Sequence, residues 1–170
     1  MSAEPAAGTT IYTIGHSNHA IERFLELLQA CKIETLIDVR SNPVSRYSPH
    51  FVKENLRGFL EANGIRYVYL GDKLGGKPGN PAFRDEEGRV SYALVAQSEA
   101  FRQGLDSAVR EAGKGRTAIM CAEDDPRNCH RYHLDTPALA ARGLTVLHIR
   151  GNGEIETQED LGRGQISLDV

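Results

Sequence analysis

Short apolar runs alternate with amphipathic stretches along most of this chain. Continuous apolar runs are typical of strands that are covered on both faces, and they occur at residues 11–14, 35–39, 65–70, 117–121 and 145–149. Between two of these runs, apolar residues recur at the spacing of an amphipathic helix, at Ile21, Phe24, Leu25 and Leu28. The pattern therefore predicts five strands separated by helices.

Capping and stop residues place the helix boundaries. Ser17 or Asn18 is a candidate cap for the first helix, and Ser48 with Pro49 begins a second that stops at Gly64. Two further helices are expected at residues 98–112 and 128–142. The glycine- and proline-rich stretch from residue 71 to 81 is expected to be a loop, long enough to cover a site.

Strands that alternate with helices form βα units. We therefore expect a three-layer α/β fold with a mostly parallel, five-stranded sheet and helices on both faces. A single domain is expected over residues 11–150, preceded by a disordered tail at 1–10 and followed by a loosely attached segment at 151–170.

In such folds, ligands bind outside the carboxyl ends of the strands. Four polar segments follow predicted strands, at residues 15–19, 40–46, 121–131 and 150–152. All four are expected to face one edge of the sheet, which makes that edge the predicted site.

Composition adds limits on class and compartment. The 25 % charged and 40 % hydrophobic residues are ordinary for a globular protein, and no apolar run is long enough to cross a bilayer. No secretory signal is visible in the first ten residues, and three cysteines are an odd number. We therefore expect a cytoplasmic protein with reduced thiols that does not bind membranes.

The charge distribution is uneven. Residues 40–84 hold eight Lys and Arg against three acids, and six of the eleven Phe and Tyr residues lie there too. Basic groups interleaved with aromatic rings suit phosphates and stacked bases. An anionic small molecule or a nucleic acid is the expected partner, although a solvated charged face above core aromatics explains the same pattern.

At "TIGHS", "IDVRSNPVSR" and "CAEDDPRNCHR" the chain resembles the bacterial family named domain of unknown function 488, from about Ile11 to Ile149. The resemblance implies a small three-layer α/β domain without an assigned reaction or cofactor. It points to the family's motif positions: Gly15, His16, Ser17, Asp38, Arg40, Pro43, Ser45, Arg46, Cys121, Glu123, Cys129, His130 and Arg131.

The first functional hypothesis is an enzyme that binds an anionic substrate related to nucleotides or nucleic acids and in which Glu123 and His130 transfer protons. Arginine forks bind phosphate or carboxylate, and the expected substrate-binding residues are His16, Ser17, Arg40, Ser45, Arg46 and Arg131. A competing interpretation is a structural ion network, in which Glu123 and Asp38 hold Arg40 and Arg131. In that case the chain is a nucleic-acid-binding module.

A fainter likeness to rhodanese-like sulfurtransferases and cysteine phosphatases makes Cys121 a candidate nucleophile. The acids that follow it, Glu123, Asp124 and Asp125, argue against a thiolate because they raise the pKa of a thiol. Four nitrogen and sulfur donors, Cys121, Cys129, His130 and His133, also suggest a metal site. The spacing of eight residues between the cysteines is wide for structural zinc, and no metal is assigned.

Overall fold

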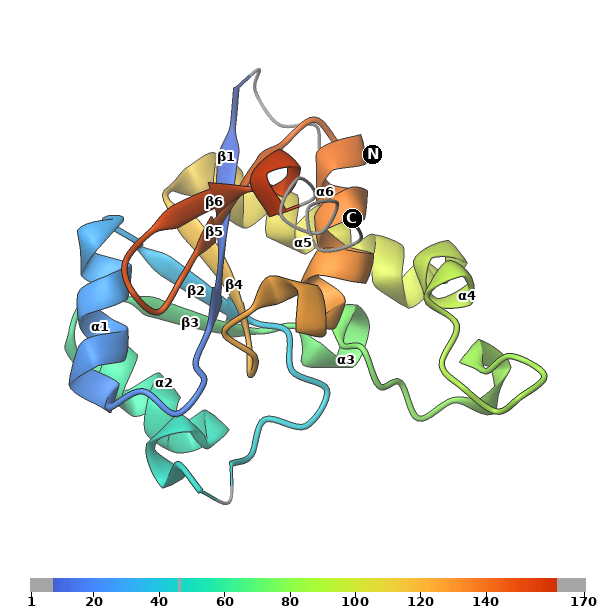
Figure 1. Cartoon of the computed structure of the whole chain (residues 1–170), viewed down its shortest axis with the longest axis horizontal. Coiled ribbons are helices and arrows are strands. Elements are labelled where there is room, and N and C mark those ends of the chain that lie inside the picture. The colour runs from blue at the N-terminus through green and yellow to red at the C-terminus, as the bar shows by residue number, and fades with distance from the viewer. Residues whose placement is uncertain (1–7, 46, 162–170) are drawn as a thin grey trace, which may run out of the picture.

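The computed structural model describes residues 8–45 and 47–161 (Figure 1). Its sheet has the strand order β3-β2-β4-β1-β5-β6. The strands are β1 (Thr10–Gly15), β2 (Thr35–Asp38), β3 (Arg66–Tyr69), β4 (Thr117–Cys121), β5 (Thr145–Ile149) and β6 (Ile155–Thr157). The first five are parallel, and β6 pairs antiparallel with β5. The mostly parallel sheet is confirmed, with β6 as a sixth strand beyond the five predicted.

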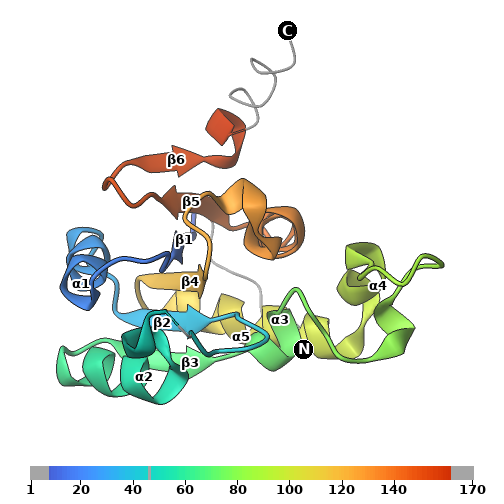
Figure 2. The ribbon, with the colours of Figure 1, turned by 60° about the horizontal axis from the view of Figure 1, so that its bottom comes forward.

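Helices cover both faces of this sheet. They are α1 (Ile21–Ala30), α2 (Lys53–Ala62), α3 (Gly71–Leu74), α4 (Tyr92–Gln97), α5 (Glu99–Lys114) and α6 (Thr136–Ala141). Helices α1 and α2 lie on one side of the strands, and α3 and α5 lie on the other (Figure 2). The three-layer architecture is therefore confirmed.

Alternation along the strands builds a separate core on each face. In β4, Ala118 and Met120 pack with α1 and α2, whereas Ile119 and Cys121 pack with α5 and α6. Because every residue of β4 is buried, this strand needs a continuous apolar run. Continuous apolar runs of this kind are the pattern from which the strands were predicted.

The prediction of one continuous helix over residues 128–142 is wrong, because this segment forms three short helical pieces of different type. The chain forms a 3₁₀ turn at Pro126–Asn128, a π-helical turn at Arg131–Asp135 and then α6. Pro137 lies in the first turn of α6 and has no N–H for a carbonyl of the preceding turn. A regular helix is therefore interrupted before it. At the start of α1 the cap residue is Ala20, without a side-chain cap bond, rather than Ser17 or Asn18.

Two other expectations change at the loop and the tail. Residues 71–74, expected to be loop, form the single turn α3. Residues 155–157 form β6, and Leu161 is 2 % exposed. The segment up to residue 161 is thus packed against the sheet rather than loosely attached, and residues 1–7 and 162–170 lie outside the described residues.

The chain leaves β4 on the opposite face of the sheet from the one on which it leaves the neighbouring strands β1 and β2. The chain leaves β1 and β2 toward α1 and α2 on one face, and it leaves β4 toward α6 on the other. A change of side between neighbouring strands opens a crevice at their carboxyl ends. The fold therefore provides a place for a site where β1, β4 and β2 end. Within the described ranges, no helix has the length and apolarity required to cross a membrane.

Gly15 allows two of these strand ends to approach closely. The backbone N–H groups of His16 and Ser17 donate to the carbonyls of Cys121 and Ala122, at 2.9 and 2.8 Å. A Cβ atom on Gly15 would lie 1.7 Å from the carbonyl oxygen of Glu123. The close contact of the β1 end with the loop after β4 thus requires glycine.

Replacement of Gly15 by alanine should destabilise the fold, because the backbone of the loop after β4 must move. We expect the free energy of unfolding to fall by about 1–3 kcal/mol, as for other overpacked sites, measured by urea denaturation. Gly113→Ala is the matched control, because Gly113 lies within α5 and a Cβ atom added there would meet no described atom within 4 Å. It should gain about 0.5–1 kcal/mol. Equal stability of Gly15→Ala and wild type would contradict the close-approach argument.

Candidate active site

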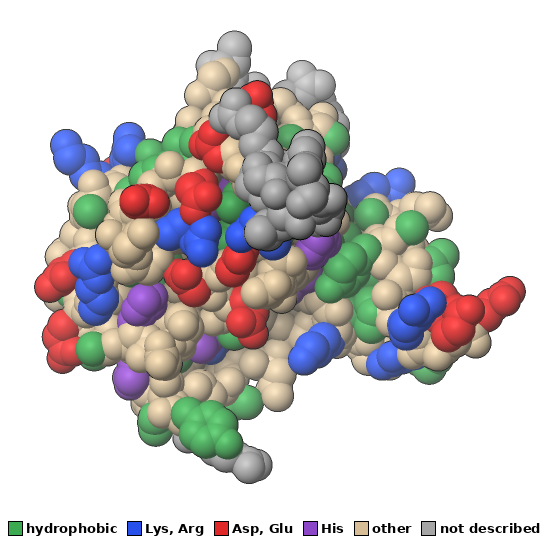
Figure 3. Space-filling view, viewed as in Figure 1, with side chains coloured by type: hydrophobic (Ala, Val, Ile, Leu, Met, Phe, Trp, Pro, Cys, Tyr) green, Lys and Arg blue, Asp and Glu red, His purple; other side chains and the backbone are tan. Residues whose placement is uncertain are grey.

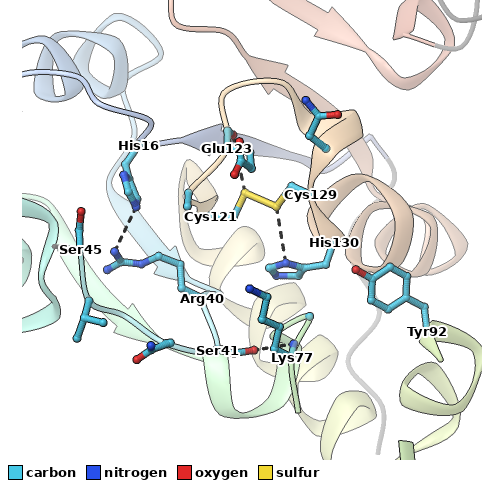
Figure 4. A pocket seen from close by; sticks show the side chains of 15 residues that line it. His16, Arg40, Ser41, Ser45, Lys77, Tyr92, Cys121, Glu123, Cys129 and His130 are labelled. Carbon is cyan, nitrogen blue, oxygen red and sulfur yellow. Dashed lines mark hydrogen bonds between the residues drawn. A yellow bond between two sulfur atoms is a disulfide. The ribbon is translucent and has the colours of Figure 1, made fainter. Parts of the chain in front are cut away.

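A cavity of about 350 Å³ lies at the carboxyl ends of β1, β2 and β4 (Figure 4). Residues from segments far apart in the sequence meet there. Six of the predicted site residues line it: His16, Arg40, Ser45, Cys121, Glu123 and His130. The edge of the sheet identified from the sequence is therefore hollowed, and a small molecule is the size of ligand that it suits.

Of the other three predicted residues, the two that the structure describes do not line this cavity. Arg131 is 0 % exposed and lies beneath it. Ser17 turns its hydroxyl toward Asn18, at 3.4 Å, and its backbone has a φ of 46°. Arg46 lies outside the described residues.

Arg40 is held by Asp38 rather than free for an anion. Its Nε and Nη2 donate to the two carboxylate oxygens of Asp38, at 2.9 and 2.8 Å, and Asp38 is fully buried. The Tyr67 hydroxyl also donates to Asp38. The positive charge of Arg40 is thus balanced, and its Nη1 is the nitrogen directed toward His16.

His16 is a neutral hydrogen-bond acceptor at this position. Its Nδ1 donates to the carbonyl of Ser17 at 2.8 Å, so its Nε2 accepts from Arg40 Nη1 at 3.3 Å. The ring also stacks on Phe51, with the ring centroids 4.5 Å apart. Burial lowers the pKa of His16 to about 4. The Asp38–Arg40 ion pair expected by the ion-network interpretation is therefore present, and His16 joins it as a neutral group.

In the acidic loop after β4, the carboxylates of Asp124 and Asp125 are bonded to groups other than Cys121. Asp124 accepts from the backbone N–H of Gly151 at 2.8 Å. Asp125 accepts from the side chain of Arg127 at 2.9 and 3.0 Å, and this bond lowers the pKa of Asp125. Glu123 is the member of the three that lines the cavity, and its side chain is exposed. The loop thus opposes a thiolate less than its sequence suggests.

Cys121 and Cys129 are joined in a disulfide in the wall of the cavity. The expectation of reduced thiols is wrong for these two residues. Cys121 is the last residue of β4, and Cys129 follows the 3₁₀ turn at Pro126–Asn128. Their sulfurs meet because the loop between them folds back over the end of β4, which the sequence separation of eight residues does not reveal.

Arg131 lies against the inner side of this disulfide. Its Nε is 3.0 Å from Cys121 Sγ, and its Nη2 donates to the carbonyls of Glu123 and Asp124 at 2.7 and 2.9 Å. Its Nη1 donates to the Thr13 hydroxyl at 2.5 Å. Among these acceptors there is no carboxylate. Burial lowers the pKa of Arg131 to about 9.

His130 contacts the other sulfur. Its Nδ1 is 3.6 Å from Cys129 Sγ, and its Nε2 donates to the carbonyl of Val39 at 3.0 Å. The Val39 bond fixes the tautomer and leaves the lone pair of Nδ1 directed at the sulfur. Burial lowers the pKa of His130 to about 4, so the ring is neutral at pH 7. No hydrogen bond between described residues joins it to the Glu123 carboxylate, its proposed partner in proton transfer.

The predicted metal donors have other roles. Cys121 and Cys129 are bonded to each other, and His133 Nε2 donates to the carbonyl of Arg127 at 2.6 Å. No group of three or more His, Cys, Asp or Glu side chains in residues 8–45 and 47–161 is placed to hold a metal ion.

The basic segment is partly neutralised by its surroundings. Arg57 pairs with Glu61 at 3.1 Å, and Arg66 pairs with Glu111. Lys53 lies 4.2 Å above the ring of Tyr69. Figure 3 shows acidic and basic side chains interspersed over the face in view. The view supports neither a single basic stripe nor a nucleic-acid-binding surface on this face.

Lys77 and Tyr92 also line the cavity and were not predicted as site residues. Lys77 belongs to the glycine-rich loop, which passes close to the site because Gly76 has no side chain; a Cβ there would lie 2.6 Å from His130 Cβ. The cluster of glycines and lysines was the available signal for Lys77. Tyr92 carried no comparable signal.

Asp135 lies behind His130 as a buried carboxyl without a hydrogen-bond partner among the described residues. It is 0 % exposed, and its Oδ2 lies 3.5 Å from His130 Nε2, which is already bonded to Val39. Removal from water raises the pKa of Asp135 well above its usual range. Because His130 is neutral at pH 7, the contact is not an ion pair.

Because the pKa of Asp135 is raised in the folded state, the unfolded chain releases its proton first as pH rises. The contribution of Asp135 to the stability of the fold is therefore fully present below about pH 4 and is lost as pH rises through its folded pKa. Asparagine does not ionise, so the Asp135→Asn variant should not lose stability in this way. Its free energy of unfolding, measured by urea denaturation, should improve relative to wild type between pH 5 and pH 8. Asp106→Asn, which removes a surface partner of Arg142, should not show this improvement. An unchanged difference between Asp135→Asn and wild type across that range would show that Asp135 is ionised in the fold.

Comparison with known proteins identifies a family but no reaction. Formate dehydrogenase 2, mitochondrial, from Oryza sativa subsp. japonica is 30 % identical to this chain over 106 residues. That match covers 62 % of this chain and 25 % of the rice protein, so the chain spans about a quarter of that relative. No solved structure matches this chain. The model of the family described as "Domain of unknown function DUF488" matches residues 20–136, which include β2, β3, β4 and both cysteines of the cavity. The chain belongs to this family.

Proposed function

We propose that this chain is an enzyme of thiol–disulfide exchange, in which the Cys121–Cys129 pair reacts with a small molecule in the cavity. One observation carries this proposal: two cysteines are joined in the wall of a cavity at the strand ends, where α/β folds bind ligands. This develops the cysteine-enzyme interpretation of the sequence, with a second sulfur added to Cys121.

The surroundings of the two sulfurs support a reactive pair. A guanidinium contacts Cys121, and an imidazole contacts Cys129. Reactive thiols occur beside cations and histidines, whereas structural cysteines lie in apolar surroundings. The acids of the loop, which argued against a thiolate, are turned toward Gly151 and Arg127 or toward solvent.

An anionic group on the substrate remains part of the proposal. Lys77 lines the cavity and is exposed enough to meet a ligand, whereas Arg40 is paired with Asp38. Glu123 lines the same cavity. A substrate with one carboxylate or phosphate, directed toward Lys77 and away from Glu123, fits this distribution of charge.

The exchange reaction needs no group beyond the two protein sulfurs and the substrate. Reduced Cys121 and Cys129 transfer two electrons to a small disulfide, which leaves as two thiols while the protein disulfide forms. The reverse reaction oxidises two thiols. Each step forms one S–S bond and breaks one.

Acid–base catalysis by Glu123 and His130 is the second candidate, because both line the same cavity. With a pKa of about 4, His130 is unprotonated at pH 7 and available as a base. Its bond to Val39 leaves only Nδ1 free, and Nδ1 faces Cys129. This geometry favours a role for His130 at sulfur over a role with Glu123.

The thiol proposal predicts fast exchange by the reduced protein with the anionic aromatic disulfide 5,5′-dithiobis(2-nitrobenzoate). One equivalent of disulfide should release two thiolates, measured by their absorbance, as Cys121 and Cys129 close. In Cys121→Ser and Cys129→Ser the second thiolate should be lost, because no internal disulfide can form. Cys31→Ser is the matched control and should keep the full release. An unchanged release in Cys121→Ser would contradict the proposal.

Glu123→Gln separates the two candidates. If sulfur carries the reaction, this variant should exchange within about threefold of the wild-type rate, because an exposed carboxylate has a small effect on a nearby thiol. The same disulfide assay measures it. Loss of exchange in Glu123→Gln, with the fold intact by circular dichroism, would favour acid–base catalysis.

A further inference from the structure

We infer that Cys129 is the sulfur that exchanges with an incoming thiol and that Cys121 is the leaving sulfur, held as a thiolate by Arg131. The pair then acts as a disulfide donor that oxidises small thiols. This inference rests on the proposed function and adds to it the direction of exchange, the order of the two cysteines and the class of substrate.

The first observation is a buried positive charge without a negative partner among the described residues. Arg131 is the largest of the fully buried side chains. Its four acceptors are Cys121 Sγ, the Thr13 hydroxyl and the carbonyls of Glu123 and Asp124, and all are neutral in the disulfide form. A buried charge is normally paired, because its removal from water is costly.

The groups bonded to Thr13 are neutral as well, and the acids that attract Arg131, namely Asp124, Asp125 and Glu123, form no ion pair with it. The Thr13 hydroxyl accepts from Arg131 and therefore donates to His148 Nδ1, at 2.7 Å. His148 Nε2 then donates to Gln158 Oε1 at 3.1 Å. Burial lowers the pKa of His148 to about 4, so this ring is uncharged at pH 7. The chain of bonds fixes Arg131 in place but does not balance its charge.

Reduction of the disulfide supplies the missing anion. A thiolate on Cys121 would lie 3.0 Å from Arg131 Nε, the distance of the present contact. Charge-assisted bonds of this kind are about twice as strong as neutral ones. The reduced form is therefore stabilised, and a disulfide whose reduced form is stabilised is the stronger oxidant.

The second observation is the difference between the two sulfurs. Cys121 is 1 % exposed and contacts a guanidinium, whereas Cys129 is 9 % exposed and contacts a neutral imidazole. An attacking thiolate needs access to one sulfur, and the other leaves faster when its thiol pKa is low. The more exposed Cys129 is therefore the sulfur that is attacked, and Cys121, whose thiolate Arg131 stabilises, is the sulfur that leaves.

The reaction has two steps. A substrate thiolate attacks Cys129 Sγ and forms a mixed disulfide, and the electron pair of the broken S–S bond stays on Cys121 Sγ. A second substrate thiolate attacks the substrate sulfur of the mixed disulfide, which releases Cys129 as a thiolate that takes a proton from water. Two thiols become one disulfide, and the protein disulfide gains two electrons.

Single-cysteine proteins test the difference between the sulfurs. With Cys31 and Cys129 replaced by serine, the rate of iodoacetamide alkylation of Cys121 should titrate with a midpoint at least one pH unit below the usual value of about 8.5. With Cys31 and Cys121 replaced, Cys129 should titrate near the usual value. A midpoint of Cys121 at or above that of Cys129 would overturn the inference.

The mixed disulfide tests the order of attack in the wild-type chain. Oxidised protein is mixed with glutathione, quenched with acid within seconds and digested, and the adduct is located by mass spectrometry. We expect it on Cys129. An adduct on Cys121 would overturn the inference and leave the proposed function intact, whereas no adduct and no thiol release would remove both. Because neither experiment alters Arg131, an unfolded Arg131 variant cannot obscure the result.

Discussion

The buried guanidinium of Arg131 is the interaction on which the arrangement of this site depends. It contacts β1 through Thr13, the end of β4 through Cys121 and the following loop through the carbonyls of Glu123 and Asp124. These carbonyls lie in irregular backbone, where sheet hydrogen bonds are not available to them. Arg131 satisfies them and thereby fixes the loop that returns Cys129 to Cys121.

The close packing of strand ends adds the second constraint. Gly15 lets the loop after β4 lie against the end of β1, and the Asp38–Arg40 pair braces the end of β2. Because these contacts involve backbone or fully buried groups, they hold the cavity walls in fixed positions. The strand ends at the site are therefore well braced, and the loops that complete the cavity wall are attached to them.

The strands and the location of the cavity were predictable from sequence, because both depend on local patterns. Buried strands need continuous apolar runs, and parallel strands direct the segments that follow them to one edge. The disulfide and the burial of Arg131 were not predictable, because both depend on how the loop at residues 122–130 folds back. An arginine in sequence suggests an anion-binding group, and only the fold shows that its partners are carbonyls and a sulfur. The π-helical turn that buries Asp135 was equally inaccessible.

The balance of charge around the cavity explains why its chemistry belongs at sulfur. Arg40 is neutralised by Asp38, and burial keeps His16 and His130 uncharged at pH 7. These groups can orient a ligand, but they place no unbalanced charge on it. The guanidinium of Arg131 forms no ion pair with a described carboxylate, and it lies beneath Cys121 and out of reach of a ligand. From this position Arg131 cannot stabilise negative charge on a substrate oxygen. It can stabilise negative charge on Cys121 Sγ, which lies between the guanidinium and the cavity.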